Sequence, residues 1–540
     1  MLAGLAGNER FQRLWPWIPL LLAVVWLGAL AADLRAIVQA IYANADFVSA
    51  PVIGELYDER APGTQVVLGN FPWYETLWFE RLTAGLPAHR QVWQLAPWLF
   101  SLAGVAAVAW ATWRAAGAWA AMVVAVALGC AGPALLTFQF GGSLHAPTFA
   151  HACLLGAFLV LCASRGGRAG SWPVHVAACA ALAAVTAAGV ASDDLLLAAG
   201  IAPFALAAIG MVWLLPRPAG PRIAVSALAV SALAVAGGRL LAKAMEDENV
   251  IASAFDVTFA TWDKLFANAR VLAHSLAYLF NGDFGGEAID LWSVLSLVCA
   301  VAVVGAVAFA VGYGRRWAAR AVAAPATDER EAARRAHLAF WLLAGAVLGL
   351  TFLLTSVPVD KYSARYVLTV GYAVAIVVAV AAVDRPWLRI GVVTGLTLVL
   401  VSGVSGLVRG TLQDSARSSP GGNLSGPLER LARAEGVEHG YAGYWTAAPL
   451  TWQTRARLQV YPVKSCTGTP TLCPYPFHRI ASWYDPRPGE RSILVVDPFQ
   501  PSAGAPTGPD PAFGAPQRVA RIADRTVYVY GYDIASRFGR

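Results

Sequence analysis

The chain has 540 residues, of which 57% are hydrophobic and only 14% are charged, and its mean hydropathy is +0.55. This apolar content lies well above that of soluble globular proteins and excludes a soluble fold. The net charge of +7 comes from 36 Arg and 4 Lys that lie mostly in short segments between apolar runs. These residues do not form one basic face, which excludes a nucleic-acid partner.

Eleven apolar runs approach the length of about 20 residues that a helix needs to cross a bilayer. They lie near residues 15–33, 92–112, 117–139, 146–163, 173–191, 195–215, 223–242, 288–313, 338–357, 367–383 and 388–408. The sequence therefore predicts an α-helical polytopic membrane protein with about eleven transmembrane helices.

The first run has a second interpretation, a cleaved signal peptide, because Arg10 and Arg13 precede its apolar stretch and small residues end it. Its roughly 18 apolar residues exceed the usual 7–15 of such a segment, which favours a retained span.

The distribution of Arg predicts the orientation. With the N-terminus in the cytoplasm, every segment assigned to the inside is basic, including the Arg-rich stretch 315–335. The short outside connections 141–145 and 192–194 contain no Lys or Arg, and 358–366 contains only Lys361 and Arg365. By the positive-inside rule we expect a multi-pass cell-membrane protein with a cytoplasmic N-terminus and an extracytoplasmic C-terminal domain.

Three regions on the predicted outer side are too long to be simple connections: 34–91, 243–287 and 409–540. Function is expected there. We expect residues 1–408 to form the transmembrane catalytic domain with the first two outer loops, 409–425 a linker, and 426–540 a small extracytoplasmic α/β domain. Within this domain the pattern predicts a helix over 428–435 and strands over 458–463, 492–496 and 526–530.

Two cysteines, Cys466 and Cys473, lie in polar sequence, whereas the other five fall inside apolar runs. Because the segment is predicted to face an oxidising compartment, a disulfide is favoured over a metal site, which would need more ligands.

Ionisable residues are sparse within the spans and collect at the predicted outer face. These outer residues are Asp46, Asp58, Glu59, Glu75, His145, Asp193, Asp194, Asp360, Lys361 and Arg365. A secondary transporter would usually bury acids near the midplane of the bilayer, so this pattern speaks against a transporter.

Asp46 follows the first span and precedes another apolar stretch. It is either a solvated acid or helix cap, or a general base towards a hydroxyl group. Asp193 and Asp194 fill a short turn between two spans, where a turn or cap is the simpler interpretation and a site at the lipid–water boundary is the other. His145 stands at the start of a span, either in a structural role or in the site.

Lys361 and Arg365 place two cations at an outer helix start, against the positive-inside trend. Either both side chains reach the interface with no further role, or they bind an anion. A guanidinium beside a lysine suits a phosphate at the headgroup level.

The architecture together with Asp46, the 192–194 turn and the pair Arg365-Tyr366 resembles the GT-C superfamily of integral membrane glycosyltransferases, in particular bacterial members that use polyprenyl-phosphate sugars. The final domain, with the segment 439–445, resembles the extracytoplasmic domains of such enzymes. The resemblance implies that Asp46 deprotonates the acceptor and that Arg365 binds the donor phosphate. Outside the roles that the resemblance implies, Lys361 is a secondary candidate for phosphate binding, and Asp193, Asp194 and His145 are secondary catalytic or acceptor-binding candidates.

The implied reaction is an inverting displacement that moves a sugar from a polyprenyl-phosphate donor to a cell-envelope glycan, lipid or protein. No cofactor is expected. A divalent metal would be relevant if Asp46 converged with Asp193 or Asp194, but cations alone can serve a monophosphate donor. Two alternatives stay open, a transporter or flippase of lipid-linked substrates and a non-enzymatic protein of cell-envelope assembly.

Overall fold

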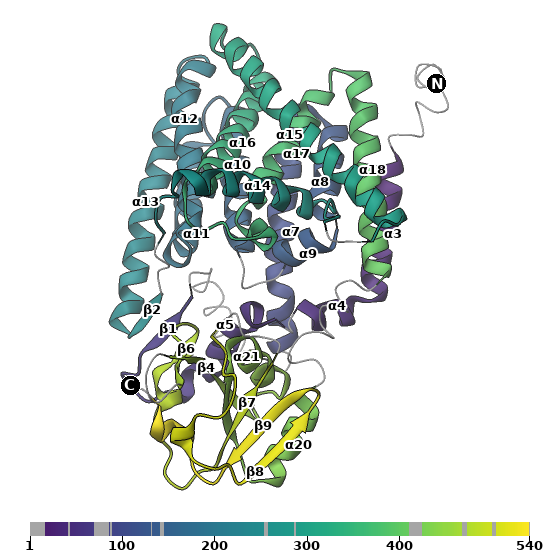
Figure 1. Ribbon diagram of the computed structural model, residues 1–540. Coiled ribbons are helices and arrows are strands. Elements are labelled where there is room, and N and C mark those ends of the chain that lie inside the picture. Colours follow the sequence, from purple (N-terminus) through teal and green to yellow (C-terminus); the bar gives the residue numbers. More distant parts are fainter. Residues whose placement is uncertain are drawn as a thin grey trace. The chain divides into compact units, whose positions relative to one another are not determined.

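The computed structural model describes residues 17–41, 44–69, 86, 89–130, 132–140, 145–252, 257–285, 288–409, 424–466, 472–498 and 504–538. The chain forms two compact units (Figure 1). Unit 1 comprises Met1–Asp33, Leu95–Leu241 and Asp256–Thr411, and unit 2 comprises Leu34–Gln94, Ala242–Phe255 and Leu412–Arg540.

Unit 1 is helical. Its elements, of which α7 and α13 run on into the residues of unit 2, are α3 (Ile18–Ala32), α7 (His89–Ala116), α8 (Ala118–Gly129), α9 (Pro133–Phe140), α10 (Ala146–Ala163), α11 (Trp172–Ser192), η3 (Leu197–Ile201), α12 (Ala202–Leu214), α13 (Ala219–Asp247), α14 (Trp262–Leu279), α15 (Leu291–Ala323), α16 (Glu329–Leu354), η4 (Lys361–Tyr366), α17 (Leu368–Ala382) and α18 (Pro386–Val408).

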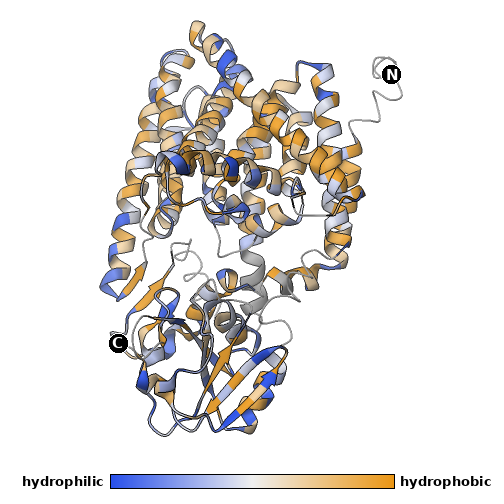
Figure 2. Cartoon of the chain, in the orientation of Figure 1, coloured by the Kyte–Doolittle hydropathy of each residue, from blue (hydrophilic) through white to orange (hydrophobic). Residues whose placement is uncertain are grey.

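Among the described residues, eight helices are long and apolar enough to cross a membrane, and the bent pair α8 and α9 would make a ninth span. Two shorter apolar helices, α3 and α17, cover the remaining runs. Each of the eleven apolar runs thus falls on a helix or on this pair, and hydrophobic residues dominate these helices in Figure 2. The prediction of a multi-pass helical membrane protein is confirmed.

The structure departs from the sequence prediction at two places in unit 1. The run 117–139 is not one straight helix, because α8 and α9 differ in direction by 85°. Pro133 opens α9, and a proline has no N–H to donate and disfavours helical geometry in the residue before it. In addition, the helix α14 occupies part of the outer region 243–287.

Helix α10 is buried along nearly its whole length and packs against α16. The approach is close at Gly156, where a Cβ atom would lie 2.7 Å from the ring of Phe340. Small residues allow such contacts between membrane helices. Because α10 begins directly after His145, this packing fixes the position of that side chain.

Unit 2 combines helices and strands. Its elements are α4 (Leu34–Ile41), α5 (Ala45–Leu56), η2 (Tyr57–Glu59), β1 (Val66–Leu68), β2 (Val250–Ala252), α20 (Ser425–Ala434), β3 (His439–Gly443), α21 (Tyr444–Gln453), β4 (Gln459–Ser465), β5 (Leu472–Pro474), β6 (Arg479–Ile480), η5 (Ala481–Tyr484), β7 (Ser492–Val496), η7 (Pro511–Phe513), β8 (Arg518–Ile522), β9 (Arg525–Tyr530) and η8 (Ile534–Arg537).

A six-stranded sheet in the order β5-β4-β3-β7-β9-β8 forms the centre of the C-terminal domain (Figure 1). The central strand β3 runs parallel to β4 and β7, and α21 is the crossover between β3 and β4. Apolar side chains of this sheet pack with Leu428 of α20 and Leu450 of α21 in one core. The predicted helix and three strands correspond to α20, β4, β7 and β9, so the α/β prediction is confirmed.

A second, three-stranded sheet joins three regions that are far apart in the sequence. Val66 of β1 pairs in parallel with Val250 of β2 and in antiparallel with Ile480 of β6. These strands come from the three long regions that the Arg pattern assigned to one side of the membrane. Their backbone hydrogen bonds hold all three within unit 2.

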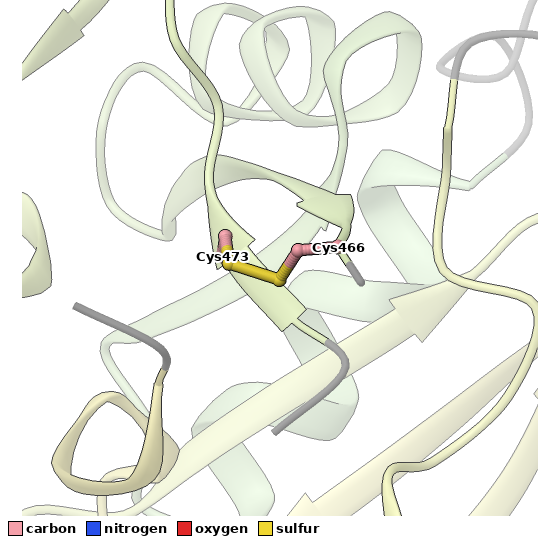
Figure 3. Close-up of a disulfide and its surroundings, with 2 residues drawn as sticks. All are labelled: Cys466 and Cys473. Atoms are coloured by element: carbon pink, nitrogen blue, oxygen red, sulfur yellow. A yellow bond between two sulfur atoms is a disulfide. The ribbon is translucent and has the colours of Figure 1, made fainter. Parts of the chain in front are cut away.

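A disulfide joins Cys466, which follows β4, to Cys473 of β5 (Figure 3). Closing so short a loop contributes about 2–3 kcal/mol at most. Of the expected linker 409–425, residues 410–423 lie outside the described part of the chain.

Candidate functional site

Asp46 lies in the first turn of α5, and its residue is only 8% exposed. The helix begins where Asn44 caps it, with the Asn44 Oδ1 atom accepting the Asp46 N–H at 2.9 Å. The positive end of the helix dipole stabilises a carboxylate in this turn. The sequence therefore fixes an ionisable carboxyl group at a helix start directly after the first apolar run.

The C-terminal domain supplies a hydrogen bond to this carboxylate. Tyr444, which follows the buried strand β3 and opens α21, donates its phenolic proton to Asp46 Oδ1 at 2.9 Å. The Ser49 hydroxyl lies 3.5 Å from the same phenolic oxygen. Burial and the Asp46 charge raise the pKa of Tyr444 well above its ordinary value, so the phenol stays neutral and acts as a donor.

Two further rings flank Tyr444. The ring of Tyr475 stacks on it with centroids 4.7 Å apart, and the ring of His478 stacks at 5.8 Å. Burial lowers the pKa of His478 to about 4, so this imidazole is neutral at pH 7. The sequence indicated the segment 439–445 but no role for Tyr444 within it, and it gave no signal for Tyr475 or His478.

In unit 1, Asp193 and His145 form a buried pair. The His145 Nδ1 atom lies 2.6 Å from Asp193 Oδ2, and the Thr148 hydroxyl donates to the same oxygen. The backbone N–H of Leu195 donates to Asp193 Oδ1 at 3.0 Å. This carboxylate therefore holds the imidazole in a fixed orientation, with Thr148 as a contact that sequence reasoning did not identify.

The two adjacent acids of the 192–194 turn separate in the structure. Whereas Asp193 is buried, Asp194 is exposed and lies 3.2 Å from the guanidinium of Arg239, which is equally exposed. Exposed ion pairs of this kind typically contribute about 0–1 kcal/mol. Of the two, Asp193 is the residue that the fold buries and holds through contacts with His145, Thr148 and Leu195.

Arg365 lies near the end of η4, which Asp360 caps through reciprocal hydrogen bonds with Ser363. The Arg365 guanidinium donates to the Tyr366 hydroxyl at 3.1 Å, and the Tyr366 ring lies 4.9 Å from the His145 ring. The structure thus brings Arg365, Tyr366, His145 and Asp193 into one cluster of unit 1. Tyr366 is the member whose contacts the sequence did not indicate, although it adjoins Arg365.

Lys361, at the start of the same short helix, donates to Asp283 at 2.5 Å, and His274 of α14 lies 3.0 Å from the other oxygen of that carboxylate. Burial raises the pKa of Asp283, but the hydrogen bonds from Lys361 and His274 outweigh this and hold it below its usual range. Asp283 is therefore ionised at neutral pH and offsets much of the Lys361 charge.

Together these contacts make two groups. Unit 1 contains His145, Asp193, Lys361 and Arg365, which offer an oriented imidazole and cations for an anion. Unit 2 contains Asp46 with Tyr444. The approach of Asp46 to Arg365 stays a prediction. Glu75 and residues 141–144 of the turn before His145 lie outside the described part of the chain.

Within the residues that the structure describes, no three His, Cys, Asp or Glu side chains are grouped so as to hold a metal ion. The sequence favours a reaction that does not depend on a metal, and that independence stays a prediction.

No family model and no curated protein matches the chain. Two solved structures do, both of ArnT from Cupriavidus metallidurans. The one bound to undecaprenyl phosphate has 14% sequence identity and a TM-score of 0.46, and the match covers 93% of this chain and 97% of that chain. The apo structure has 15% identity and a TM-score of 0.47, with 95% and 98% covered. Structural similarity at this level does not indicate which reaction the chain performs.

Proposed function

We propose that the chain is a membrane glycosyltransferase that moves a sugar from a polyprenyl-phosphate donor to a cell-envelope glycan, lipid or protein. In this proposal the N-terminus is cytoplasmic, and residues 426–540 form a domain outside the membrane. The observation that carries the proposal is the buried carboxylate of Asp46, a residue that follows the first apolar helix in the chain. The phenol of Tyr444, in the C-terminal domain, donates a hydrogen bond to this carboxylate at 2.9 Å.

In the proposed step, Asp46 accepts the proton of the acceptor hydroxyl. The acceptor oxygen forms a bond to the anomeric carbon from one face, and the carbon–oxygen bond to the phosphate breaks on the other, so the configuration inverts. The electron pair of the broken bond leaves with the lipid phosphate. Because phosphate is a good leaving group, no acid is required to protonate it.

Arg365 is the proposed phosphate contact. Its guanidinium is half-buried and oriented by the Tyr366 hydroxyl at 3.1 Å, which limits the entropy lost when an anion binds. Lys361 would join it once the phosphate competes with Asp283 for the ammonium group. A cation held at the site stabilises the charge that grows on the leaving oxygen.

A second base candidate is His145, because Asp193 orients its imidazole at 2.6 Å in the manner of an acid–base pair. In the proposed function this pair instead binds and orients the acceptor beside Tyr366. The transporter and assembly-protein alternatives require no proton acceptor at Asp46. Undecaprenyl phosphate, bound in one of the two ArnT structures, is a polyprenyl phosphate without a sugar, like the proposed leaving group, but the proposal does not rest on it.

The proposal is tested by incubating the purified protein with a panel of radiolabelled polyprenyl-phosphate sugars and membrane-derived acceptors. We expect transfer from at least one donor, reduced about 10²–10⁴-fold by Asp46→Asn. The asparagine Oδ1 can still accept the Tyr444 hydrogen bond, so this variant removes the base and keeps the contact. Asp194→Asn, an exposed position, serves as the control. Full activity of the Asp46→Asn protein would contradict the base assignment, and absence of transfer from every donor would contradict the function.

A further inference from the structure

A crevice of about 810 Å³ lies within unit 1 among α12, α15, α16 and α17, away from the residues of the candidate site. Small residues line much of it, including Gly210, Ala310, Gly314, Gly345 and Ala346. Because these positions carry little or no side chain, the four helices leave room between them. The volume falls in the range of about 300–1,000 Å³ that is typical of ligand sites.

The lining residues are apolar except for one, Arg315 of α15. Trp213 and Trp317 also line the crevice, and Trp213 is 63% exposed. Tryptophan and arginine are typical of the membrane–water interface, where an apolar body meets a charged group. The crevice therefore has the character of a site for an amphiphile, with a long apolar part and one cationic contact.

The sequence of α15 sets the depth of this contact. No charged residue occurs between positions 291 and 314, a helical length of about 36 Å that exceeds the roughly 30 Å hydrocarbon layer. Arg315 is the first charge beyond it and is accordingly at the level of the lipid headgroups. Arg316 and Arg320 follow in the same exposed helix end.

These three arginines carry uncompensated charge. Among the described residues, no carboxylate forms an ion pair with Arg315, Arg316 or Arg320, whereas the neighbouring Arg334 and Arg335 pair with Asp384 and Glu331. Basic pockets between transmembrane helices attract anionic lipid headgroups, each arginine contributing about 1 kcal/mol near the surface.

We propose that this crevice binds an anionic glycerophospholipid of the bilayer, with its acyl chains between α12, α15, α16 and α17 and its phosphate on Arg315. The site is separate from the proposed donor site and does not depend on the proposed activity. A bound lipid replaces the missing side-chain contacts between the four helices and so stabilises unit 1.

Native mass spectrometry of the full-length protein with equal amounts of phosphatidylglycerol and phosphatidylcholine tests this. The wild type should retain phosphatidylglycerol preferentially, and Arg315→Gln should reduce the preference about fivefold, whereas Arg320→Gln, at an exposed position outside the lining, should reduce it less. Ala346→Phe fills the crevice and should abolish retention of both lipids. Ala308→Phe, on an exposed position of α15 outside the lining, should not.

Three outcomes would overturn the proposal. Equal retention by the Ala346→Phe and Ala308→Phe proteins would mean that the lipid binds elsewhere. An unchanged preference in Arg315→Gln would remove the headgroup contact. Displacement of phosphatidylglycerol by millimolar inorganic phosphate alone would show an anion site without a lipid. Thermal unfolding of each variant without added lipid verifies that it is folded.

Discussion

The two buried carboxylates of the candidate site, Asp46 in unit 2 and Asp193 in unit 1, are held by chemically different partners. Asp193 accepts hydrogen bonds from the Leu195 backbone N–H and from the Thr148 hydroxyl. It also lies 2.6 Å from the His145 imidazole, a group that can carry a proton itself. Asp46 accepts a hydrogen bond from the Tyr444 phenol, and the raised pKa of Tyr444 keeps that phenol neutral. The first arrangement orients a histidine, and the second leaves the proton-accepting capacity on the carboxylate.

This difference explains why we assign the base to Asp46 and a positioning role to Asp193. A carboxylate that serves to orient a neighbour acts through that neighbour, so its loss should cost less than the loss of the base. If the contrast holds, replacements at the two carboxylates and at their partners should differ in the size of their effects.

After Asp46 itself, the largest effect is expected at Arg365. Arg365→Ala removes a cation that meets the donor phosphate in both the ground and transition states, so donor binding should weaken and turnover should fall about 10²–10³-fold. Initial-rate measurements over a range of donor concentrations report both changes. Arg239→Ala, which removes an exposed guanidinium, is the matched control. Wild-type kinetics in the Arg365→Ala protein would exclude it from the donor site.

Tyr444→Phe removes the phenol from Asp46 but keeps the ring stack. Loss of a hydrogen bond to a charged acceptor should destabilise the contact between α5 and α21 by about 1.5–3 kcal/mol. The ionised carboxylate also loses a hydrogen-bond donor, so the acid limb of the pH–rate profile should shift to higher pH. Hydrogen exchange of the α21 amides and the pH profile measure the two effects.

Tyr475→Phe is the control for this variant, since it preserves the 4.7 Å ring stack. An acid limb at the same pH in the Tyr444→Phe and wild-type enzymes would mean that Tyr444 serves the fold alone.

Asp193→Asn should lower turnover only about tenfold, the equivalent of one hydrogen bond that positions His145. The same assay run beside Asp46→Asn makes the comparison direct. A loss as large as that of Asp46→Asn would move the base assignment to the His145–Asp193 pair and reverse the contrast between the two units.

The smallest effect concerns His478 and pH. Its pKa is about 4 in the folded state and about 6.5 when exposed, so the unfolded state binds more protons between these values. Stability of unit 2 should therefore fall as the pH decreases from 6.5 to 4, by about 1 kcal/mol at pH 5.5 from this residue. His478→Phe should flatten that dependence in hydrogen exchange of β3. An identical pH dependence in both proteins would contradict it.

Local sequence patterns predicted the elements but not the pairings between distant segments. Apolar length located the membrane helices, and short runs rich in β-branched and aromatic residues located β4, β7 and β9, because these signals depend on neighbouring residues alone. The Asp46–Tyr444 hydrogen bond joins residues 398 positions apart, and the sheet β2-β1-β6 joins three separate regions. No local pattern specifies such contacts, which arise from packing within unit 2.

Two further features escaped sequence reasoning for related reasons. The amphipathic helix α14 lies in a region whose mixed polarity resembled a loop, and its His274 contributes to the Asp283 contacts of Lys361. Asp193 and Asp194 are adjacent and chemically identical, and only the end of α11 decides that the first points inward to His145 and the second outward to Arg239.

The central claim is that Asp46 and Arg365 act on the same sugar, and an experimental structure of the full-length protein with a non-transferable polyprenyl-phosphonate sugar tests it most directly. We predict that the Asp46 carboxylate and the Arg365 guanidinium face one outward cavity within roughly 15 Å of each other, with the sugar between them and the acceptor side open to Asp46. A sugar bound beside Arg365 with Asp46 facing a different cavity would contradict the account.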